Sequence, residues 1–288
     1  MLRIGMLTSG GDCQALNAAM RGVVKGLFQA RKDVEIYGFE EGYKGLIYSN
    51  FRMLKAEDFS GILTVGGTIL GTSRQPFKLM RVPDENGLDK VEAMKHTYHK
   101  LSLDCLVILG GNGTHKTANL LREEGLNVVT LPKTIDNDLW GTELTFGFQS
   151  AIDIASTVID SIHSTAFSHS RVFIVEVMGH KAGWLTLYAG IASGADVIVI
   201  PEIPTPQKKI AAAIEKRAKR ANDSPSCGRG GCHQSRRSQA EQKGIQGCPR
   251  GDDLSVHLLP HCGRTQGADR SGDPRYHSRA ITSAAGAP

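Results

Sequence analysis

Short apolar runs rich in β-branched residues alternate with longer amphipathic stretches over residues 1–220, and this alternation constrains the fold most strongly. Such alternation is typical of a parallel sheet covered by helices. The sequence therefore predicts an α/β protein, and Pro132 is expected to end one of its strands. Strands are expected at residues 2–8, 33–39, 103–109, 127–131, 172–177 and 196–200, and helices at 15–30, 114–124, 148–166, 184–191 and 208–220.

Length and composition exclude several classes of protein. The 288 residues, 40% of them hydrophobic, suffice for one large or two modest domains with a buried core. A net charge of +5 falls short of the basic stripe of a nucleic-acid binder, so nucleic acid is not an expected partner. The first residues match no secretory signal and no apolar run reaches membrane-spanning length. We therefore expect a cytoplasmic protein without membrane contact, in which Cys13 and Cys105 are reduced thiols.

Three of the expected strands end in loops that are rich in glycine or carboxylate. These loops are residues 9–12 (Ser-Gly-Gly-Asp), 110–114 (Gly-Gly-Asn-Gly-Thr) and 132–138 (Pro-Lys-Thr-Ile-Asp-Asn-Asp). The carboxyl ends of parallel strands are where open α/β sheets bind ligands. Glycine lets backbone amides approach phosphate oxygens, and a following helix N-terminus favours an anion. A tight turn that requires a positive φ explains either Gly-Gly pair equally well.

The third loop carries the sharper signal. Asp136 and Asp138 stand two residues apart, close to Lys133 and Thr134. Phosphoryl transfer needs a base near the attacking hydroxyl, a metal site for the phosphates and positive charge for the developing anion. An Asx turn is the structural alternative for this loop. A Walker A sequence, the other common phosphate device, is absent from the chain.

Five groups of residues share their order and spacing with one enzyme family. They are Thr8-Ser9-Gly10-Gly11-Asp12 with Leu16-Asn17-Ala18, Gly66-Gly67-Thr68 with Leu70-Gly71-Thr72-Ser73-Arg74, residues 132–138, Arg171 with Val175-Glu176-Val177-Met178-Gly179, and Ala182-Gly183-Trp184. Over roughly residues 1 to 205 the chain strongly resembles the phosphofructokinase family. The resemblance implies two Rossmann-like three-layer domains with mainly parallel sheets. Residues 1–138 would bind the phosphoryl donor ATP, and residues 139–221 would form an incomplete domain for fructose 6-phosphate.

The same resemblance implies a glycolytic kinase that moves the terminal phosphoryl group of ATP to the 1-hydroxyl of fructose 6-phosphate, giving fructose 1,6-bisphosphate. It further implies Mg²⁺ and a homo-oligomer, a dimer or a tetramer. Asp136 matches the catalytic base, with Thr134 and Asp138 beside it. The positions that match donor-binding residues are Gly10, Gly11, Tyr43, Arg74, Gly111, Asn112, Gly113, Thr114 and Lys133. Those that match sugar-binding residues are Thr134, Asp136, Asp138, Arg171, Met178, Gly179 and His180, and those for the metal are Asn112 and Asp138.

Several positions depart from the commonest family pattern. Gln14 and Ala15 replace a Pro-Gly pair, which alters the stiffness of the first loop but removes no charge. Asn112 stands where the family usually has a magnesium-binding Asp, so the site loses one negative charge. His180 replaces an arginine that faces the transferring phosphate, and it is a weaker and pH-dependent substitute. A surface histidine that caps the next helix is the alternative interpretation of His180.

Two positions decide which phosphoryl donor is expected. Gly113 leaves open the space that an Asp fills in family members using pyrophosphate, whereas Lys133 matches a lysine of those enzymes. Nucleotide users with the same pair also belong to the family. Because a blocked pocket excludes ATP whereas an added lysine only assists an anion, ATP is favoured and pyrophosphate is the runner-up.

Residues 222–288 differ in character from the rest of the chain. Gly, Ser, Arg, Gln, Cys and His dominate, and only residues 254–259 form a short hydrophobic patch. An irregular, mostly disordered tail is expected because so little apolar surface cannot offset the ordering entropy. The family's Gly-His-x-Gln-Arg-Gly-Gly turn, which binds the sugar phosphate, is not found, so a catalytically silent phosphate-binding fragment is a second functional hypothesis.

Two explanations of the tail remain open. We interpret it as translation out of frame from near Asn222, and finding the missing turn in neither of the other two frames of the gene would contradict this. The alternative is a zinc site, although the spacing of its candidate ligands fits no familiar Cys-x-x-Cys arrangement. Those ligands are Cys227, Cys232, His233, Cys248, His257, His261 and Cys262.

Overall fold

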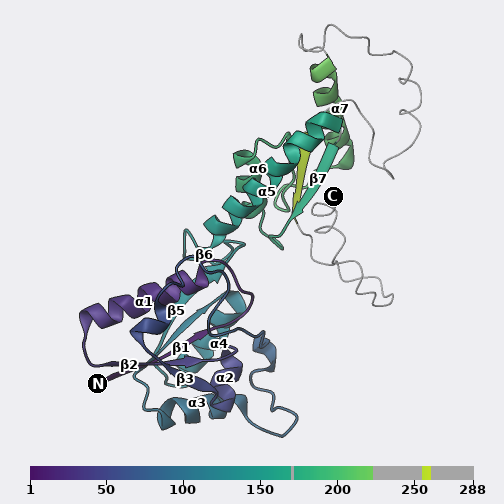
Figure 1. Cartoon of the computed structure of the whole chain (residues 1–288). Coiled ribbons are helices and arrows are strands. Elements are labelled where there is room, and N and C mark those ends of the chain that lie inside the picture. Colours follow the sequence, from purple (N-terminus) through teal and green to yellow (C-terminus); the bar gives the residue numbers. More distant parts are fainter. Residues whose placement is uncertain (170–171, 223–254, 261–288) are drawn as a thin grey trace. The chain divides into compact units, whose positions relative to one another are not determined.

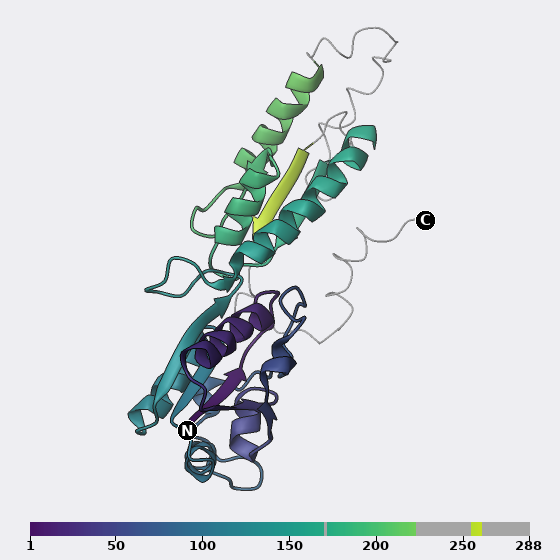
Figure 2. The ribbon, with the colours of Figure 1, turned by 60° about the vertical axis from the view of Figure 1, so that its left-hand side comes forward.

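The computed structural model describes residues 1–169, 172–222 and 255–260 (Figures 1 and 2). The chain forms two compact units, Met1–Ala151 and Ile152–Pro288, each with its own sheet. Among the described residues, no helix combines the length and the hydropathy needed to cross a membrane.

The first unit is built on a six-stranded sheet with the order β3-β2-β1-β4-β5-β6. Only the β2–β3 pair is antiparallel, and every other neighbouring pair is parallel. In chain order its elements are β1 (Leu2–Thr8), α1 (Leu16–Ala30), β2 (Val34–Phe39), α2 (Tyr43–Tyr48), β3 (Phe51–Leu54), two 3-10 turns (Ala56–Phe59 and Phe77–Leu79), α3 (Lys90–Lys100), β4 (Cys105–Gly110), α4 (Asn112–Glu123), β5 (Val128–Thr134) and β6 (Phe146–Gly147).

Side chains of the central strand β4 point alternately to two apolar layers. Leu106 and Ile108 pack in one core cluster with residues of α2, α3 and α4. Val107 and Leu109 pack in the other cluster, with residues of α1. The sheet therefore separates α1 from the other three helices, as Figures 1 and 2 show, and the expected α/β fold with a mainly parallel sheet is confirmed.

After β1 the chain adds β2 and β3 on one side of this strand and then crosses to add β4 on its other side. This reversal of strand order is a topological switch point of the sheet. β2 and β3 lie on one side of β1, whereas β4, β5 and β6 lie on the other. Loops at the carboxyl ends of β1 and β4 therefore flank a crevice, the usual ligand site of an open α/β sheet. These are the loops at residues 9–12 and 110–114.

Several elements differ from the sequence-based expectation. The pattern missed α2, β3 and α3, although Asp89 caps α3 by accepting hydrogen bonds from the amides of Val91 and Glu92. The expectation that Pro132 ends its strand is wrong, because β5 continues to Thr134. Pro132 lies where β5 stops pairing with β4 and starts pairing with β6, a position that tolerates a missing amide hydrogen.

The second unit contains a three-stranded parallel sheet with the order β7-β9-β8. Its elements are α5 (Phe148–His169), β7 (Val172–Val177), α6 (Trp184–Ala192), β8 (Val197–Ile198), α7 (Gln207–Asn222) and β9 (Ser255–Pro260). β8 is shorter than the strand expected at residues 196–200. α6 packs against β8 and β9, and α7 packs against β8.

The strand β9 is a regular element within the tail that was expected to be irregular and mostly disordered. Ser255–Pro260 falls in the short hydrophobic patch of the sequence and pairs with β7 on one side and with β8 on the other. A strand that is paired on both sides needs only a short apolar run and no helical periodicity. The remainder of the expectation for residues 223–288 lies outside the described residues, as does the proposed zinc site apart from His257.

Candidate active site

The loop after β1 is held by the segment that leads to Arg74. Gly10 has a φ of +93°, which favours glycine at this turn. Its amide donates to the carbonyl oxygen of Ser73 at 3.2 Å, and its own carbonyl accepts a bond from Oγ1 of Thr72 at 2.8 Å. These two bonds fix the glycine loop and the base of Arg74 to one another.

The side chains of Arg74 and Lys133 lie close to the backbone of Gly10 and Gly11. A Cβ atom on Gly11 would come within 3.6 Å of Nη2 of Arg74, and one on Gly10 would come within 3.7 Å of Nζ of Lys133. The absence of side chains therefore leaves an arginine and a lysine close to the backbone of the first loop. Positive charge beside accessible backbone is suited to phosphate oxygens.

Lys133 reaches this loop from β5, across the intervening strand β4. Only 5% of the residue is exposed, and Nζ donates a hydrogen bond to the carbonyl oxygen of Gly11. Burial lowers the pKa of the ammonium group, while the nearby charges of Cys13, Asp12 and Asp136 raise it and that of Arg74 lowers it further. The buried charge thus has a cost in stability.

We expect Lys133→Met to change how the stability of the chain depends on pH. A folded-state pKa below the unfolded value of about 10.4 means that the unfolded chain binds more protons. Wild-type stability therefore gains with rising pH towards that value, by at most about 1.4 kcal/mol per pH unit. The methionine variant should lack this gain, so its advantage over wild type should shrink between pH 7 and pH 10.

Urea unfolding at several pH values measures this difference. Lys25→Met, which removes an exposed lysine from α1, is the matched control and should leave the pH dependence of the wild type in place. A parallel pH dependence of the free energy of unfolding in Lys133→Met and wild type would contradict the assignment of a costly buried charge.

The end of β4 is packed tightly beneath the first turn of α4. A Cβ atom on Gly110 would lie 2.4 Å from side-chain atoms of Thr114. Oγ1 of Thr114 donates to the carbonyl oxygen of Ser9 at 3.3 Å, and the carbonyl of Thr114 accepts a bond from the hydroxyl of Tyr43 at 2.8 Å. Gly111 lies beside β5, because a Cβ atom there would come within 3.5 Å of the carbonyl oxygen of Lys133.

The outer part of this turn is open. Asn112 and Gly113 are exposed, and a Cβ atom on Gly113 would meet no atom within 4 Å. A side chain at position 113 would therefore extend into free space without disturbing the fold.

The loop after β5 is held by hydrogen bonds that involve Thr134, Asn137 and Thr145. Asn137 has a φ of +52° and accepts a bond from the amide of Thr145 at 3.0 Å, and Oγ1 of Thr145 donates to the carbonyl of Thr134 at 2.6 Å. The amide of Asp136 donates to Oγ1 of Thr134 at 3.1 Å. Asp136 is half-buried and Asp138 is exposed.

Apart from the three on the β5 loop, the sugar-binding positions implied by the resemblance belong to the second unit. Met178 is 59% exposed and His180, with a φ of +52°, is exposed as well. Gly179 allows a tight turn after β7, because a Cβ atom there would lie 2.4 Å from the carbonyl oxygen of Ala182. Arg171 lies outside the described residues. Gly183, not His180, occupies the N-cap position of α6.

The candidate metal ligands fit the chemistry of Mg²⁺. Asn112 offers an amide oxygen and Asp138 a carboxylate, and both are exposed. Magnesium takes hard oxygen ligands and is commonly held by one or two protein groups together with water and phosphate. Over the described ranges, no three or more His, Cys, Asp or Glu side chains are grouped so that they could hold a metal ion. An all-protein metal cage is therefore not found there.

Two residues that the sequence-based site omitted lie near its centre. Asp12 and Cys13 are both close enough to Lys133 for their charges to affect its pKa. The side chain of Cys13 also approaches Gly147, where a Cβ atom would lie 2.6 Å from its Sγ, and burial raises the pKa of this thiol. The signal in the sequence that could have identified them is their position directly after Gly10 and Gly11. Cys13 and Cys105 are free thiols.

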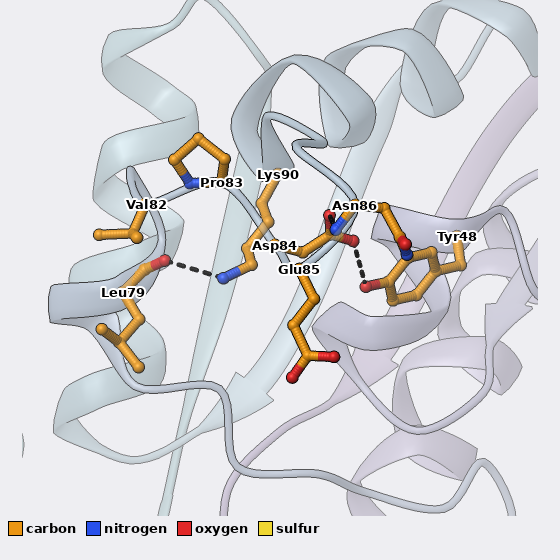
Figure 3. Close-up of a pocket in the computed structure, with 8 residues that line it drawn as sticks. All are labelled: Tyr48, Leu79, Val82, Pro83, Asp84, Glu85, Asn86 and Lys90. Carbon is orange, nitrogen blue, oxygen red and sulfur yellow. Dashed lines mark hydrogen bonds between the residues drawn. The ribbon is translucent and has the colours of Figure 1, made fainter.

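A pocket of about 380 Å³ lies between the end of α2 and the loop before α3 (Figure 3). None of the expected site residues lines it. Asp84 accepts a bond from the hydroxyl of Tyr48 at 2.9 Å, and Nζ of Lys90 donates to the carbonyl of Leu79 at 3.1 Å. Its polar groups therefore hold the loop itself. The lining residues are Tyr48, Leu79, Val82, Pro83, Asp84, Glu85, Asn86 and Lys90.

Comparison with protein families gives one match over most of the chain. Residues 3–229 match the family described as phosphofructokinase. The match ends close to residue 222, where the composition of the sequence changes.

Individual proteins give the same result. The ATP-dependent 6-phosphofructokinase of Spirochaeta thermophila is 59% identical over 226 residues, which cover 76% of this chain and 60% of that protein. A pyrophosphate–fructose 6-phosphate 1-phosphotransferase of Amycolatopsis methanolica is 43% identical, with 75% and 61% covered. The structure of phosphofructokinase from Saccharomyces cerevisiae matches with a TM-score of 0.71 and 30% identity, over 90% of this chain and 33% of that one. The chain thus spans about 60% of the length of the curated relatives it matches.

Proposed function

Because the chain belongs to the phosphofructokinase family, we propose that it transfers the terminal phosphoryl group of ATP to the 1-hydroxyl of fructose 6-phosphate. The products would be fructose 1,6-bisphosphate and ADP, as in glycolysis. The proposal is supported by relatives named ATP-dependent 6-phosphofructokinase. A homo-oligomeric state, as a dimer or a tetramer, and a cytoplasmic location remain predictions.

One observation in the first unit carries this proposal. Lys133 extends from β5 to bond the carbonyl of Gly11, and the guanidinium of Arg74 lies over the same loop. Two cations, exposed backbone and the adjacent Asp136 loop therefore meet at the switch point of the sheet. In-line phosphoryl transfer depends mainly on this combination of positioning and positive charge.

In the proposed reaction each residue has a separate task. Asp136 takes the proton from the 1-hydroxyl as this oxygen attacks the terminal phosphorus of ATP, and ADP leaves with the electrons of the broken bond. Arg74, Lys133 and the amides of the first loop stabilise the charge that develops on the transferred phosphoryl oxygens. Thr134 orients Asp136 through the bond to its amide.

The metal and the sugar have their own proposed ligands. Asn112 and Asp138 would hold Mg²⁺, which neutralises phosphate charge when it is bound. Met178, Gly179 and His180 would contact fructose 6-phosphate, and Arg171 would reach the sugar phosphate bound to a neighbouring subunit. An arginine at position 171 suits the sugar phosphate by its bidentate geometry.

The choice of ATP over pyrophosphate rests on the open space at Gly113. A Cβ atom there has no neighbour within 4 Å, so the backbone leaves room for the α-phosphate of a nucleotide. Pyrophosphate remains the alternative donor, because Lys133 matches the pyrophosphate users and one relative carries that name.

The test is an assay of the purified full chain with fructose 6-phosphate and either ATP or pyrophosphate. Formation of fructose 1,6-bisphosphate with ATP but not with pyrophosphate supports the proposal. Formation with pyrophosphate but not with ATP would show that pyrophosphate is the donor. Binding of a donor without turnover favours the second hypothesis, a catalytically silent phosphate-binding fragment. The observation behind that hypothesis is that the Gly-His-x-Gln-Arg-Gly-Gly turn of the family is not found in the sequence.

A further inference from the structure

The hydroxyl of Tyr43 is engaged in a hydrogen bond inside the protein, to the backbone of α4. Tyr43 is the first residue of α2, it is 1% exposed, and its hydroxyl donates a 2.8 Å hydrogen bond to the carbonyl of Thr114. Burial raises the pKa of the hydroxyl well above its usual range, so it stays protonated and can act as the donor of this bond. The phenol therefore supports the first turn of α4 from beneath.

Neighbouring contacts tie the same turn to the other loops of the crevice. Gly42 has a φ of +67°, and a Cβ atom there would come within 2.7 Å of the carbonyl oxygen of Thr8, so only glycine lets α2 start this close to β1. Thr114 bonds the carbonyl of Ser9, and the amide of Ser9 bonds the carbonyl of Leu109 at 2.9 Å. The loops after β1, β2 and β4 are thereby joined.

Among the described residues, nothing packs on the outer side of this turn at Gly113. Asn112 and Gly113 are exposed, and the space around Gly113 is empty. Two of the hydrogen bonds that hold the turn lie beneath it, and Thr114 makes them with Ser9 and with Tyr43. Because a binding site for phosphate needs amides that already point the right way, loss of such a support weakens binding without removing any direct contact.

We propose that Tyr43 is a positioning residue for the phosphoryl donor, which acts by fixing the first turn of α4 through the carbonyl of Thr114. This inference rests on the proposed function, since it assumes that the turn binds the donor. It gives the tyrosine a role that differs from the direct donor contact implied by the family resemblance.

The test compares Tyr43→Phe with Tyr37→Phe in the full chain. Both tyrosines are nearly buried, but the hydroxyl of Tyr37 bonds Glu35 on its own strand β2. Hydrogen–deuterium exchange in residues 115–118 should rise several-fold in Tyr43→Phe and stay unchanged in Tyr37→Phe. Calorimetric Kd values for MgATP should rise by about 5- to 10-fold in Tyr43→Phe alone, as expected for one lost hydrogen bond.

Further readouts separate positioning from general stability. Replacing Tyr43 with 4-aminophenylalanine keeps a hydrogen-bond donor at the same place and should restore both exchange and affinity. Where turnover is measurable, KM for the nucleotide should rise while KM for fructose 6-phosphate stays the same.

The outcomes distinguish this inference from the function on which it rests. Unchanged exchange in Tyr43→Phe, or faster exchange with unchanged MgATP affinity, overturns the positioning role alone. A wild-type chain that binds neither MgATP nor pyrophosphate overturns the positioning role and the proposed function together. Equal effects in the two phenylalanine variants also overturn it, because they would indicate a general loss of packing.

Discussion

Asp136→Asn is expected to lower kcat by about 100- to 10,000-fold, the range that one well-placed general base contributes. Asparagine matches the size of the aspartate and leaves the backbone bond from residue 136 to Thr134 in place. It cannot accept the proton of the sugar hydroxyl. Lys133 and Arg74 are unchanged, so Kd for MgATP should stay near the wild-type value. A coupled assay of ADP release and calorimetry of MgATP binding measure the two quantities.

Asp153→Asn provides the matched control for this prediction. It makes the same chemical change at an exposed position of α5 and should leave kcat unaltered. If Asp136→Asn kept more than about a tenth of wild-type kcat, the residue would contribute less than a general base does, and another group would have to take the proton.

Gly113→Asp is expected to weaken ATP binding by about 100-fold or more, while pyrophosphate binding is retained. The open space around Gly113 accepts the new side chain, so the fold should be preserved. The carboxylate would then occupy the room left for the α-phosphate of ATP, which pyrophosphate lacks, and repel it, and like charges in contact cost several kcal/mol. Calorimetric titration with MgATP and with pyrophosphate measures both affinities.

Two further variants at this position separate volume from charge. Gly113→Asn adds nearly the same volume without the charge and should weaken ATP binding less than aspartate does. Gly113→Ala adds one methyl group and should have a small effect. Equal affinity for ATP in wild type and Gly113→Asp would contradict the placement of the nucleotide over this turn.

The parts of the fold that the sequence predicted are those with strong periodicity. β1, α1, β4 and α5 have long apolar patterns bounded by glycine or by polar turns, and each was expected within a few residues of its actual bounds. β3 has only four residues and pairs antiparallel at the edge of the sheet, so it has too few positions to show an alternation. α3 buries Val91, Met94 and Tyr98 at helical spacing, but its many charged and polar residues mask that signal.

Tertiary pairing explains the other differences. Pro132 was expected to end a strand because proline cannot donate to a ladder, yet β5 changes partner at that residue and continues. The residues of β9 formed a short hydrophobic patch in the sequence, but its partners β7 and β8 are distant in the chain, so the pairing could not be read from the patch alone.

The sequence identified the loops of the candidate site but not the contacts between them. Motif spacing singled out Gly10, Gly11 and Lys133, since glycine and lysine at strand ends suit phosphate. It did not indicate that Lys133 bonds the carbonyl of Gly11, because β1 and β5 are separated by β4 and the reach of one side chain decides this contact. The bond from Tyr43 to Thr114 was equally hidden, since it depends on the tight start of α2 at Gly42.

The strand order of the second unit affects how a nascent chain must assemble. Of the described strands, β7 and β8 pair only with β9, so the central strand of this sheet is the last of the three to be synthesised. Until residues 255–260 emerge, the two earlier strands present unsatisfied backbone edges, which are templates for wrong pairing. The first unit has all its strands before residue 148 and can fold during synthesis. The sheet of the second unit can therefore close only after residues 255–260 have been synthesised, later than the sheet of the first unit.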